Sequence, residues 1–252
     1  MSIVLHEREW VEDVISNPQL GKRPSETLER VARYYIKAEG YNKRQARDKL
    51  DSFLFQCDPK SAGSQWSTMM DNAVKSAEKK DLVDLDGVDV YAEELETIAG
   101  IESRQIRRLA FTLLCVAKYR NAINPLNNGW VTDYDVSIIQ TANIHASKLK
   151  QNAMFMAMRE RGLIGYSKKV DNLSVRVDYL REEGTPKIFI TDFRNLGYQY
   201  QFYLGEPFLQ CSHCGLTVKR GSNSHKYCKE CAAEMYVKQS VESVMRKRAS
   251  VT

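Results

Sequence analysis

The sequence predicts a mainly helical chain with small β elements, an α+β fold, and three observations lead to this prediction. Apolar residues recur at helical spacing through the first 80 residues and again in the middle of the chain. Two short runs, 163–167 and 173–179, have the composition of paired strands. Four cysteines form two close pairs within residues 211–231. The 252 residues are 43% hydrophobic and 10% aromatic, which suits packed domains rather than disorder.

Residues 1–80 are expected to form a helical module. Leu28, Val31 and Ala32 begin an i, i+3, i+4 pattern, which places them on one face of a helix. Asn42 stands where it could cap a third helix. Such stripes indicate a packed core rather than ligand sites, and the module is expected to serve in partner binding or oligomerisation.

Residues 81–100 hold seven acids and no bases, and we expect them to be an acidic connector. Residues 101–205 are expected to form the next domain. Its expected helices are one ending near residue 120, a short one after residue 133 and, beyond a turn at 141–143, a longer one from about 147 to 161. Its expected strands are 163–167 and 173–179, followed by two extra strands at 188–190 and 198–204. Gly162 is expected to end the longer helix.

This order of elements is that of a winged helix-turn-helix domain. The segment MRERGLIGYSKKVDNLSVRVDYL resembles the end of the recognition helix and the wing of winged-helix DNA-binding proteins, in which Gly-Leu-Ile follows the helix. Gly162, Leu163 and Ile164 match that step. The resemblance covers about residues 101–180, and a generic α+β domain is the alternative.

The paired cysteines predict one structural zinc ion. Two Cys-x-x-Cys pairs stand thirteen residues apart, and a two-residue spacer lets both thiolates of a pair reach one ion. The expected ligands are Cys211, Cys214, Cys228 and Cys231. His213 and His225 could substitute, but four sulfurs already fill a tetrahedron and leave no position for water or substrate. Redox pairs or free thiols are the alternative, and no thioredoxin-like pattern surrounds them.

The segment CSHCGLTVKRGSNSHKYCKECAAEMYVKQSVESVMRKRA resembles small zinc ribbons at the C-termini of bacteriophage proteins from Gram-positive hosts. In these, a Lys/Tyr-Cys-x-x-Cys-Ala step enters a basic terminal helix. The resemblance implies a zinc ribbon over residues 206–234 and a basic C-terminal helix over residues 235–252.

Basic residues are concentrated in two segments, which points to a polyanionic partner. Residues 101–169 carry a net charge of +7 and residues 211–252 a net charge of +5. Solvated surface is the alternative for each of these residues. The candidate nucleic-acid contacts are Arg104, Arg107, Arg108, Lys148, Lys150, Gln151, Asn152, Lys168, Lys169, Lys219, Arg220, Arg246, Lys247 and Arg248.

One feature of the longer helix weighs against strong base readout. If Met154, Phe155 and Met158 face the core, the outer face carries Leu149, Asn152, Ala153 and Met156. That face is poor in groups that read base edges, so direct readout is expected to be weak, or the helix contacts a protein instead.

The layout resembles replication-initiation and regulatory proteins of phages of Gram-positive hosts. It implies a protein that binds double-stranded DNA in phage or plasmid replication initiation or transcriptional regulation, with or without oligomerisation. The alternative is a protein-binding adaptor or inhibitor of a host nucleic-acid machine. An enzyme is not expected, because no clustered carboxylates, catalytic triad or phosphate loop is found. With no signal peptide and no apolar run long enough to span a bilayer, a cytoplasmic location is expected.

Overall fold

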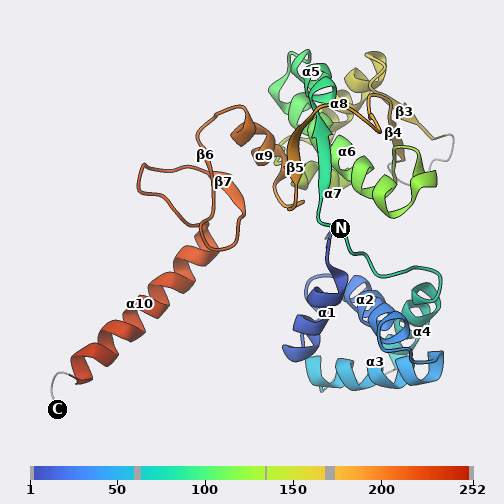
Figure 1. The fold of residues 1–252 in the computed structure, drawn as a ribbon, viewed down its shortest axis with the longest axis vertical. Helices are drawn as coiled ribbons and strands as arrows, with labels where there is room; N and C mark the ends of the chain where they lie inside the picture. Colours follow the sequence, from blue (N-terminus) through green and yellow to red (C-terminus); the bar gives the residue numbers. More distant parts are fainter. Residues whose placement is uncertain (1–2, 60–63, 134, 168–173, 250–252) are drawn as a thin grey trace. The chain divides into compact units, whose positions relative to one another are not determined.

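The structure, a computed structural model, describes residues 3–59, 64–133, 135–167 and 174–249, and over these ranges it is mainly helical with small sheets, an α+β fold (Figure 1). The chain divides into two compact units, Ile3–Asp86 and Gly87–Thr252. Each unit is described by itself below.

The first unit consists of helices, as the sequence predicted for this part of the chain. They are α1 (Glu7–Ser16), α2 (Pro24–Lys37), α3 (Lys43–Cys57) and α4 (Ser64–Ala77). Asn42 caps α3 as expected: its side chain accepts a hydrogen bond from the Gln45 backbone N–H at 3.0 Å, and the Gln45 side chain accepts one from the Asn42 N–H.

One apolar cluster joins all four helices of this unit. Leu28, Val31 and Ala32 of α2 are fully buried in it, which confirms the helical face predicted from their spacing. The other fully buried members, such as Val11 and Leu50, come from the helices that pack around α2. The unit therefore has a hydrophobic core of its own.

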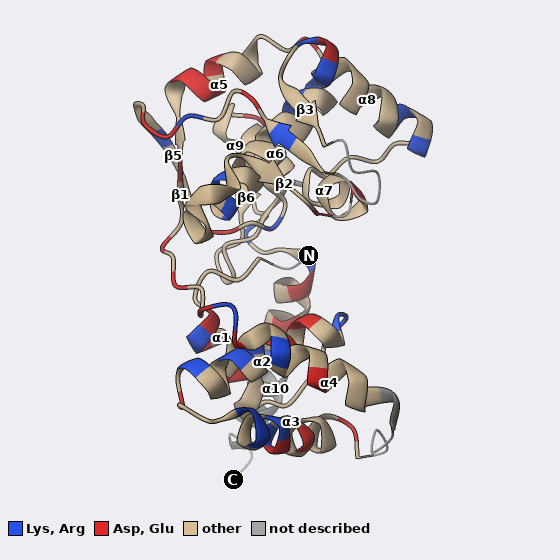
Figure 2. Cartoon of the chain, turned by 90° about the vertical axis from the view of Figure 1, so that its right-hand side faces the viewer, with Lys and Arg blue, Asp and Glu red and all other residues tan. Residues whose placement is uncertain are grey.

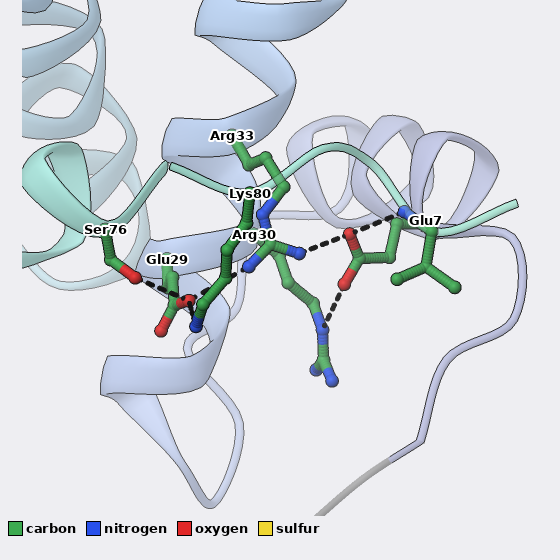
Figure 3. Close-up of polar contacts among 7 residues, drawn as sticks. Glu7, Glu29, Arg30, Arg33, Ser76 and Lys80 are labelled. Carbon is green, nitrogen blue, oxygen red and sulfur yellow. Dashed lines mark hydrogen bonds and ion pairs between the residues drawn. The ribbon is translucent and has the colours of Figure 1, made fainter. Parts of the chain in front are cut away.

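A buried ionic network crosses the same unit (Figure 3). The carboxylate of Glu7 accepts hydrogen bonds from Arg33 at 2.5 Å and from Arg30 at 3.3 Å. Arg33 also donates to Glu29 at 2.9 Å, and Glu29 accepts a further bond from Lys80 at 2.7 Å. Because Glu7 and Arg33 are both buried, neither can exchange its partner for water, and removal of one would leave the other without its shortest ion pair.

The second unit is built around α6 (Arg104–Ile123), a long helix buried on most of its surface from Leu109 to Tyr119. The other helices are α5 (Ala92–Ala99), the 3-10 turn η1 (Pro125–Asn127), α7 (Asp135–Thr141), α8 (Lys148–Glu160), α9 (Leu196–Tyr203) and α10 (Lys229–Ala249). The strands are β1 (Val88–Tyr91), β2 (Trp130–Val131), β3 (Ile164–Tyr166), β4 (Val175–Val177), β5 (Pro186–Ile190), β6 (Phe208–Gln210) and β7 (Thr217–Lys219).

The strands of this unit pair antiparallel in three small sheets within the described part of the chain. β1 pairs with β5, so that Val88 lies opposite Ile190. β4 lies between β2 and β3, giving the order β2-β4-β3. β6 and β7 form a hairpin. The helix order α6, α7, α8 and the pairing of β3 with β4 agree with the predicted elements, whereas β2 was not predicted.

Two segments differ from their expected structure. The segment expected to be an acidic connector, 81–100, contains β1 and α5. The expected strand at 198–204 is wrong, because this stretch belongs to helix α9. The stretch was predicted as a strand because it is short and apolar, but Leu196 and Tyr200, one helical turn apart, are buried together. The ring of Tyr200 lies 5.0 Å from that of Phe111 in α6, and this packing favours the helix.

A buried ion pair that the sequence did not reveal joins α5 to α6. Lys118 Nζ lies 3.0 Å from a carboxylate oxygen of Glu94, and these side chains are 8% and 0% exposed. Glu94 also accepts backbone hydrogen bonds from Tyr91 and Arg181, both at 2.8 Å. These partners satisfy a carboxylate that has no contact with water.

Among the described residues, no helix combines the length and the apolar character needed to cross a lipid bilayer.

Candidate metal centre and the helix pair joined to it

The four cysteines predicted as metal ligands come together. Cys211 follows β6, Cys214 lies in the turn of the hairpin, Cys228 precedes α10, and Cys231 lies in the first turn of α10. Their four sulfur atoms all lie within 4.8 Å of one another, and the Sγ atoms of Cys214 and Cys228 are 3.8 Å apart. Cys214 is half-buried and the other three are buried. This group could hold a metal ion.

The thiols of the cluster have unequal proton affinities. Burial raises the pKa of Cys211, but hydrogen bonds from backbone groups of Cys228, Cys214 and His213 outweigh this and lower it to about 6. Burial and contact with the other thiols raise the pKa of Cys231. Four thiolates this close would repel one another, and a divalent cation between them would remove that repulsion.

The two neighbouring histidines have different surroundings. His225 Nδ1 accepts a hydrogen bond from the Gly221 N–H at 2.9 Å, so its Nε2 carries the proton and donates to the Tyr227 carbonyl at 2.7 Å. Both ring nitrogens of His225 therefore hold the tip of the loop together. His213 is exposed, with Nδ1 3.5 Å from the sulfur of Cys231.

Several basic side chains lie on the segment that carries the cysteine cluster. A hollow of about 460 Å³ beside Cys228 is lined in part by Lys219, Lys226 and Lys229. Arg220 is exposed next to Lys219, and its backbone N–H donates to the Pro207 carbonyl at 2.9 Å. Three further candidates belong to α10, and their side chains lie outside the part that the structure describes: Arg246, Lys247 and Arg248.

Asn195, at the start of α9, joins the cysteine segment to the turn between α7 and α8. Its side-chain amide donates to the Thr217 carbonyl in β7 at 3.0 Å. Its side-chain oxygen accepts from Asn143 in the α7–α8 turn, also at 3.0 Å. Nearby, Arg194 donates to the Cys214 carbonyl at 2.8 Å. Asn195 therefore connects the cysteine segment directly to the turn between helices α7 and α8.

Gly197 makes this connection possible. A Cβ atom at this position would lie 2.0 Å from the carbonyl oxygen of Ala142, a backbone atom that cannot move aside. Only glycine lets α9 approach the α7–α8 turn so closely. The Tyr198 N–H then donates to the side-chain oxygen of Asn143 at 3.1 Å, which fixes the turn further.

Helix α8 buries the face that the sequence predicted. Met154, Phe155 and Met158 are buried against the rest of the unit. On the opposite face, Leu149 is 81% exposed and Met156 is 47% exposed. Asn152 and Ala153 are exposed on that same face. The outer surface of α8 is thus apolar at its centre.

The polar candidates on and near α8 have mixed surroundings. Lys148 forms an ion pair with Asp135 at the start of α7. Gln151 donates to the Ala146 carbonyl at 2.8 Å, so one of its two amide N–H groups is used locally. Lys150 is exposed. Lys168 and Lys169, the candidates at the expected wing tip, lie outside the described residues.

The three arginine candidates at the start of α6 lie against α9. Arg104 pairs with Glu206 and with Gln201. The Nε atoms of Arg107 and Arg108 are buried and have no hydrogen-bond partner among the described residues. Burial lowers the pKa of Arg108. Arg104 is nevertheless exposed, whereas Arg107 and Arg108 are half-buried, so only Arg107 and Arg108 are partly withdrawn from the surface.

Comparisons with protein-family models, with curated proteins and with solved structures found no match for this chain.

Proposed function

We propose that this protein binds double-stranded DNA through α8 and the β3–β4 pair, in a winged helix-turn-helix arrangement. The observation that carries the proposal is the order α6, β2, α7, α8, β3, β4 together with the sheet order β2-β4-β3. In helix-turn-helix proteins the second helix of the pair enters the major groove. Here that helix is α8, and the adjoining strands supply the wing.

The surroundings of α8 support a role as the groove-entering helix. Its buried face fixes it on the unit, and its outer face is open. Figure 2 shows lysine and arginine at both ends of α8 and none along its middle. Such an arrangement suits contacts with two phosphate backbones on either side of a groove.

The cysteine cluster is proposed to hold one structural Zn²⁺. A tetrahedron with zinc–sulfur bonds of about 2.3 Å has edges of about 3.8 Å. The separation of 3.8 Å between the sulfurs of Cys214 and Cys228 agrees with such an edge. In addition, the Cys231 N–H lies 3.5 Å from the sulfur of Cys228, where it would stabilise a bound thiolate.

The proposed zinc has a positioning role. It would fold the β6–β7 hairpin into a small ribbon and hold Lys219 and Arg220 in place. Through Asn195 it would also steady the α7–α8 turn. With four sulfur ligands it has no open position for substrate, so no catalytic step is assigned to it.

The biological setting is proposed from the sequence resemblance: replication initiation or transcriptional regulation in a phage or plasmid. The first unit, Ile3–Asp86, would then bind a partner protein or a second copy. The alternative function is a protein-binding adaptor or inhibitor. It is favoured by the apolar outer face of α8, with Leu149 and Met156 exposed.

Selection of bound fragments from a random pool of duplex DNA tests the proposal. It is run with the full chain at about 50 mM and about 200 mM salt. We expect an enriched sequence, with affinity that falls steeply as salt rises. A pool that shows neither enrichment nor salt dependence would overturn DNA binding and favour the protein-binding alternative.

A pair of variants sharpens this test. Lys150→Glu at the start of α8 is expected to weaken binding to all sequences. It should also reduce the magnitude of the slope of log binding constant against log salt concentration by about one or more. Lys187→Glu makes the same charge change on the exposed strand β5, and we expect it to leave binding nearly unchanged. Equal effects of both variants would contradict the assignment of α8.

A further inference from the structure

We infer that α8 recognises the C5 methyl groups of thymine, so that the DNA bound by this protein is rich in A·T pairs at the positions α8 contacts. The inference rests on the proposed function, because it names the class of DNA sequence that this helix would select. It depends on the exposed side chains of α8 and their order along the helix.

The exposed centre of α8 is an apolar stripe. Leu149, Ala153 and Met156 are spaced i, i+4 and i+7, which places them on one face of the helix. All three are exposed, and Leu149 is 81% exposed although it has one of the most apolar side chains. In the major groove, the apolar group that a base pair presents is the methyl group of thymine.

The same face lacks the groups that favour guanine. Guanine is read mainly by arginine or lysine donating to its O6 and N7 atoms. No arginine or lysine lies between Lys150 and Arg159 on α8. Asn152 is the exposed amide beside the stripe, and asparagine pairs with the N6 and N7 atoms of adenine. Both the apolar side chains and the amide therefore favour A·T pairs.

Cations flank the stripe on both sides. With 3.6 residues per turn, Lys150 falls on one side of the stripe and Arg159 on the other. The guanidinium of Arg159 lies 5.4 Å from the ring centroid of Tyr166 in β3, which positions it beside the helix. An apolar centre between two cations complements a groove, where methyl groups lie between two rows of phosphates.

A protein partner fits this surface less well. A standard protein interface buries about 800 Å² on each side and centres on aromatic or arginine anchors. The stripe offers two large aliphatic side chains, Leu149 and Met156, and no aromatic one. Glu160 lies on the same face in the last turn, so the apolar stripe ends at Met156. The stripe begins at Leu149 in the first turn, the part of a recognition helix that meets the base edges.

Replacement of thymine by uracil in the duplex tests the inference, because uracil lacks only the C5 methyl group. The best sequence from the selection is synthesised with uracil at each thymine in turn, and its dissociation constant for the full-length chain is measured. Loss of one buried methyl group is expected to weaken binding about fourfold, from about 0.8 kcal/mol per methyl-sized group.

Two variants locate the contact. Leu149→Ala is expected to weaken binding to the thymine duplex and to abolish the effect of uracil at one position. Leu126→Ala removes another highly exposed leucine, 91% exposed in η1, and the loss of affinity on uracil replacement is expected to remain in full. Leu149 is on the surface, so its replacement should not disturb folding.

The outcomes separate this inference from the proposed function. DNA that binds with salt dependence but tolerates uracil at every position would overturn thymine recognition and leave DNA binding intact. A selected site composed of G·C pairs would overturn it as well. If no duplex DNA binds at any salt concentration, both DNA binding and thymine recognition are overturned.

Discussion

The first unit and the cysteine segment reach a folded structure by different means. In Ile3–Asp86, an apolar cluster with several fully buried members joins four helices, and a buried ionic network crosses it. In the segment from β6 to the start of α10, the buried members of the local cluster are Cys211, Cys228 and Cys231, and the other side chains packed against that cluster are only partly buried. Phe208 and Leu209 of β6 are also buried, but they lie outside this cluster. The first region has a core of apolar side chains, whereas the core of the second is the proposed metal site.

This difference indicates what each region needs in order to stay folded. Burial of apolar area stabilises a unit whatever ligands are present. A segment of about twenty residues cannot bury enough apolar area to offset its lost conformational entropy without a disulfide or a metal. The cysteine segment should therefore depend on the proposed ion, and the first unit should not.

The largest expected effect is that of metal removal. Cys228→Ser, or chelation, should unfold the segment between β6 and α10, because apparent binding energies of structural zinc are on the order of 10 kcal/mol. Backbone hydrogen exchange of Phe208–Gln210 and Thr217–Lys219 should become fast, while exchange in the first unit stays slow. Cys57→Ser, which changes a cysteine outside the cluster, is the control, and it should leave the segment protected.

The next effect concerns the buried network of the first unit. Arg33→Ala leaves the carboxylate of Glu7 buried without its main partner, and we expect a loss of about 3–5 kcal/mol in the free energy of unfolding. Urea denaturation of the full chain measures it. Arg8→Ala removes an exposed pair with Glu12 and should cost less than about 1 kcal/mol. Equal losses for the two variants would show that burial does not determine how much this network contributes to the free energy of unfolding.

A smaller effect is expected where the cysteine segment meets the helix pair. Asn195→Ala removes two hydrogen bonds and should cost about 1–3 kcal/mol. Asn195 also has a φ of +51°, which glycine adopts without strain, so Asn195→Gly should cost less than Asn195→Ala. Hydrogen exchange at Asn143 should rise in both variants. Unchanged exchange there would contradict a connection between the two regions.

The smallest effect is a pH dependence in the first unit. Burial raises the pKa of Glu29, but hydrogen bonds from Lys80 and Ser76 outweigh this and lower it below its usual value. The stabilisation from Glu29 is therefore present above the usual pKa of about 4.5 and is lost as the pH falls through the lowered folded value. Glu29→Gln should make stability less dependent on pH in that range. A variant with the wild-type pH profile would rule out this contribution.

Local signals in the sequence predicted most of the helices and the cysteine cluster. The spacing of Leu28, Val31 and Ala32 predicted the buried face of α2, and the two Cys-x-x-Cys pairs predicted which four cysteines form a cluster. Gly162 gave the end of α8. Each of these features depends on residues near one another in the chain, or on a residue type with few structural roles, such as paired cysteine or glycine at a helix end.

Features that depend on distant residues were not predictable. β1 is completed by β5, about a hundred residues later, and nothing near Val88 indicates that partner. The short apolar stretch at 198–204 was predicted as a strand, whereas in the structure it belongs to α9, whose Tyr200 packs on Phe111 of α6. Among the candidate contacts, Gln151 and Lys148 have local partners that a list of polar residues cannot show. The role of Asn195 likewise depends on two segments that meet only in the folded chain.

The measurement that tests the central claim most directly is the metal content of the purified chain, determined together with the protein concentration. If four thiolates hold the segment around one ion, the wild-type chain should contain one zinc per molecule, and Cys228→Ser should contain much less. A wild-type chain with well under one zinc per molecule, in which the segment from β6 to α10 is nevertheless protected from hydrogen exchange, would contradict it.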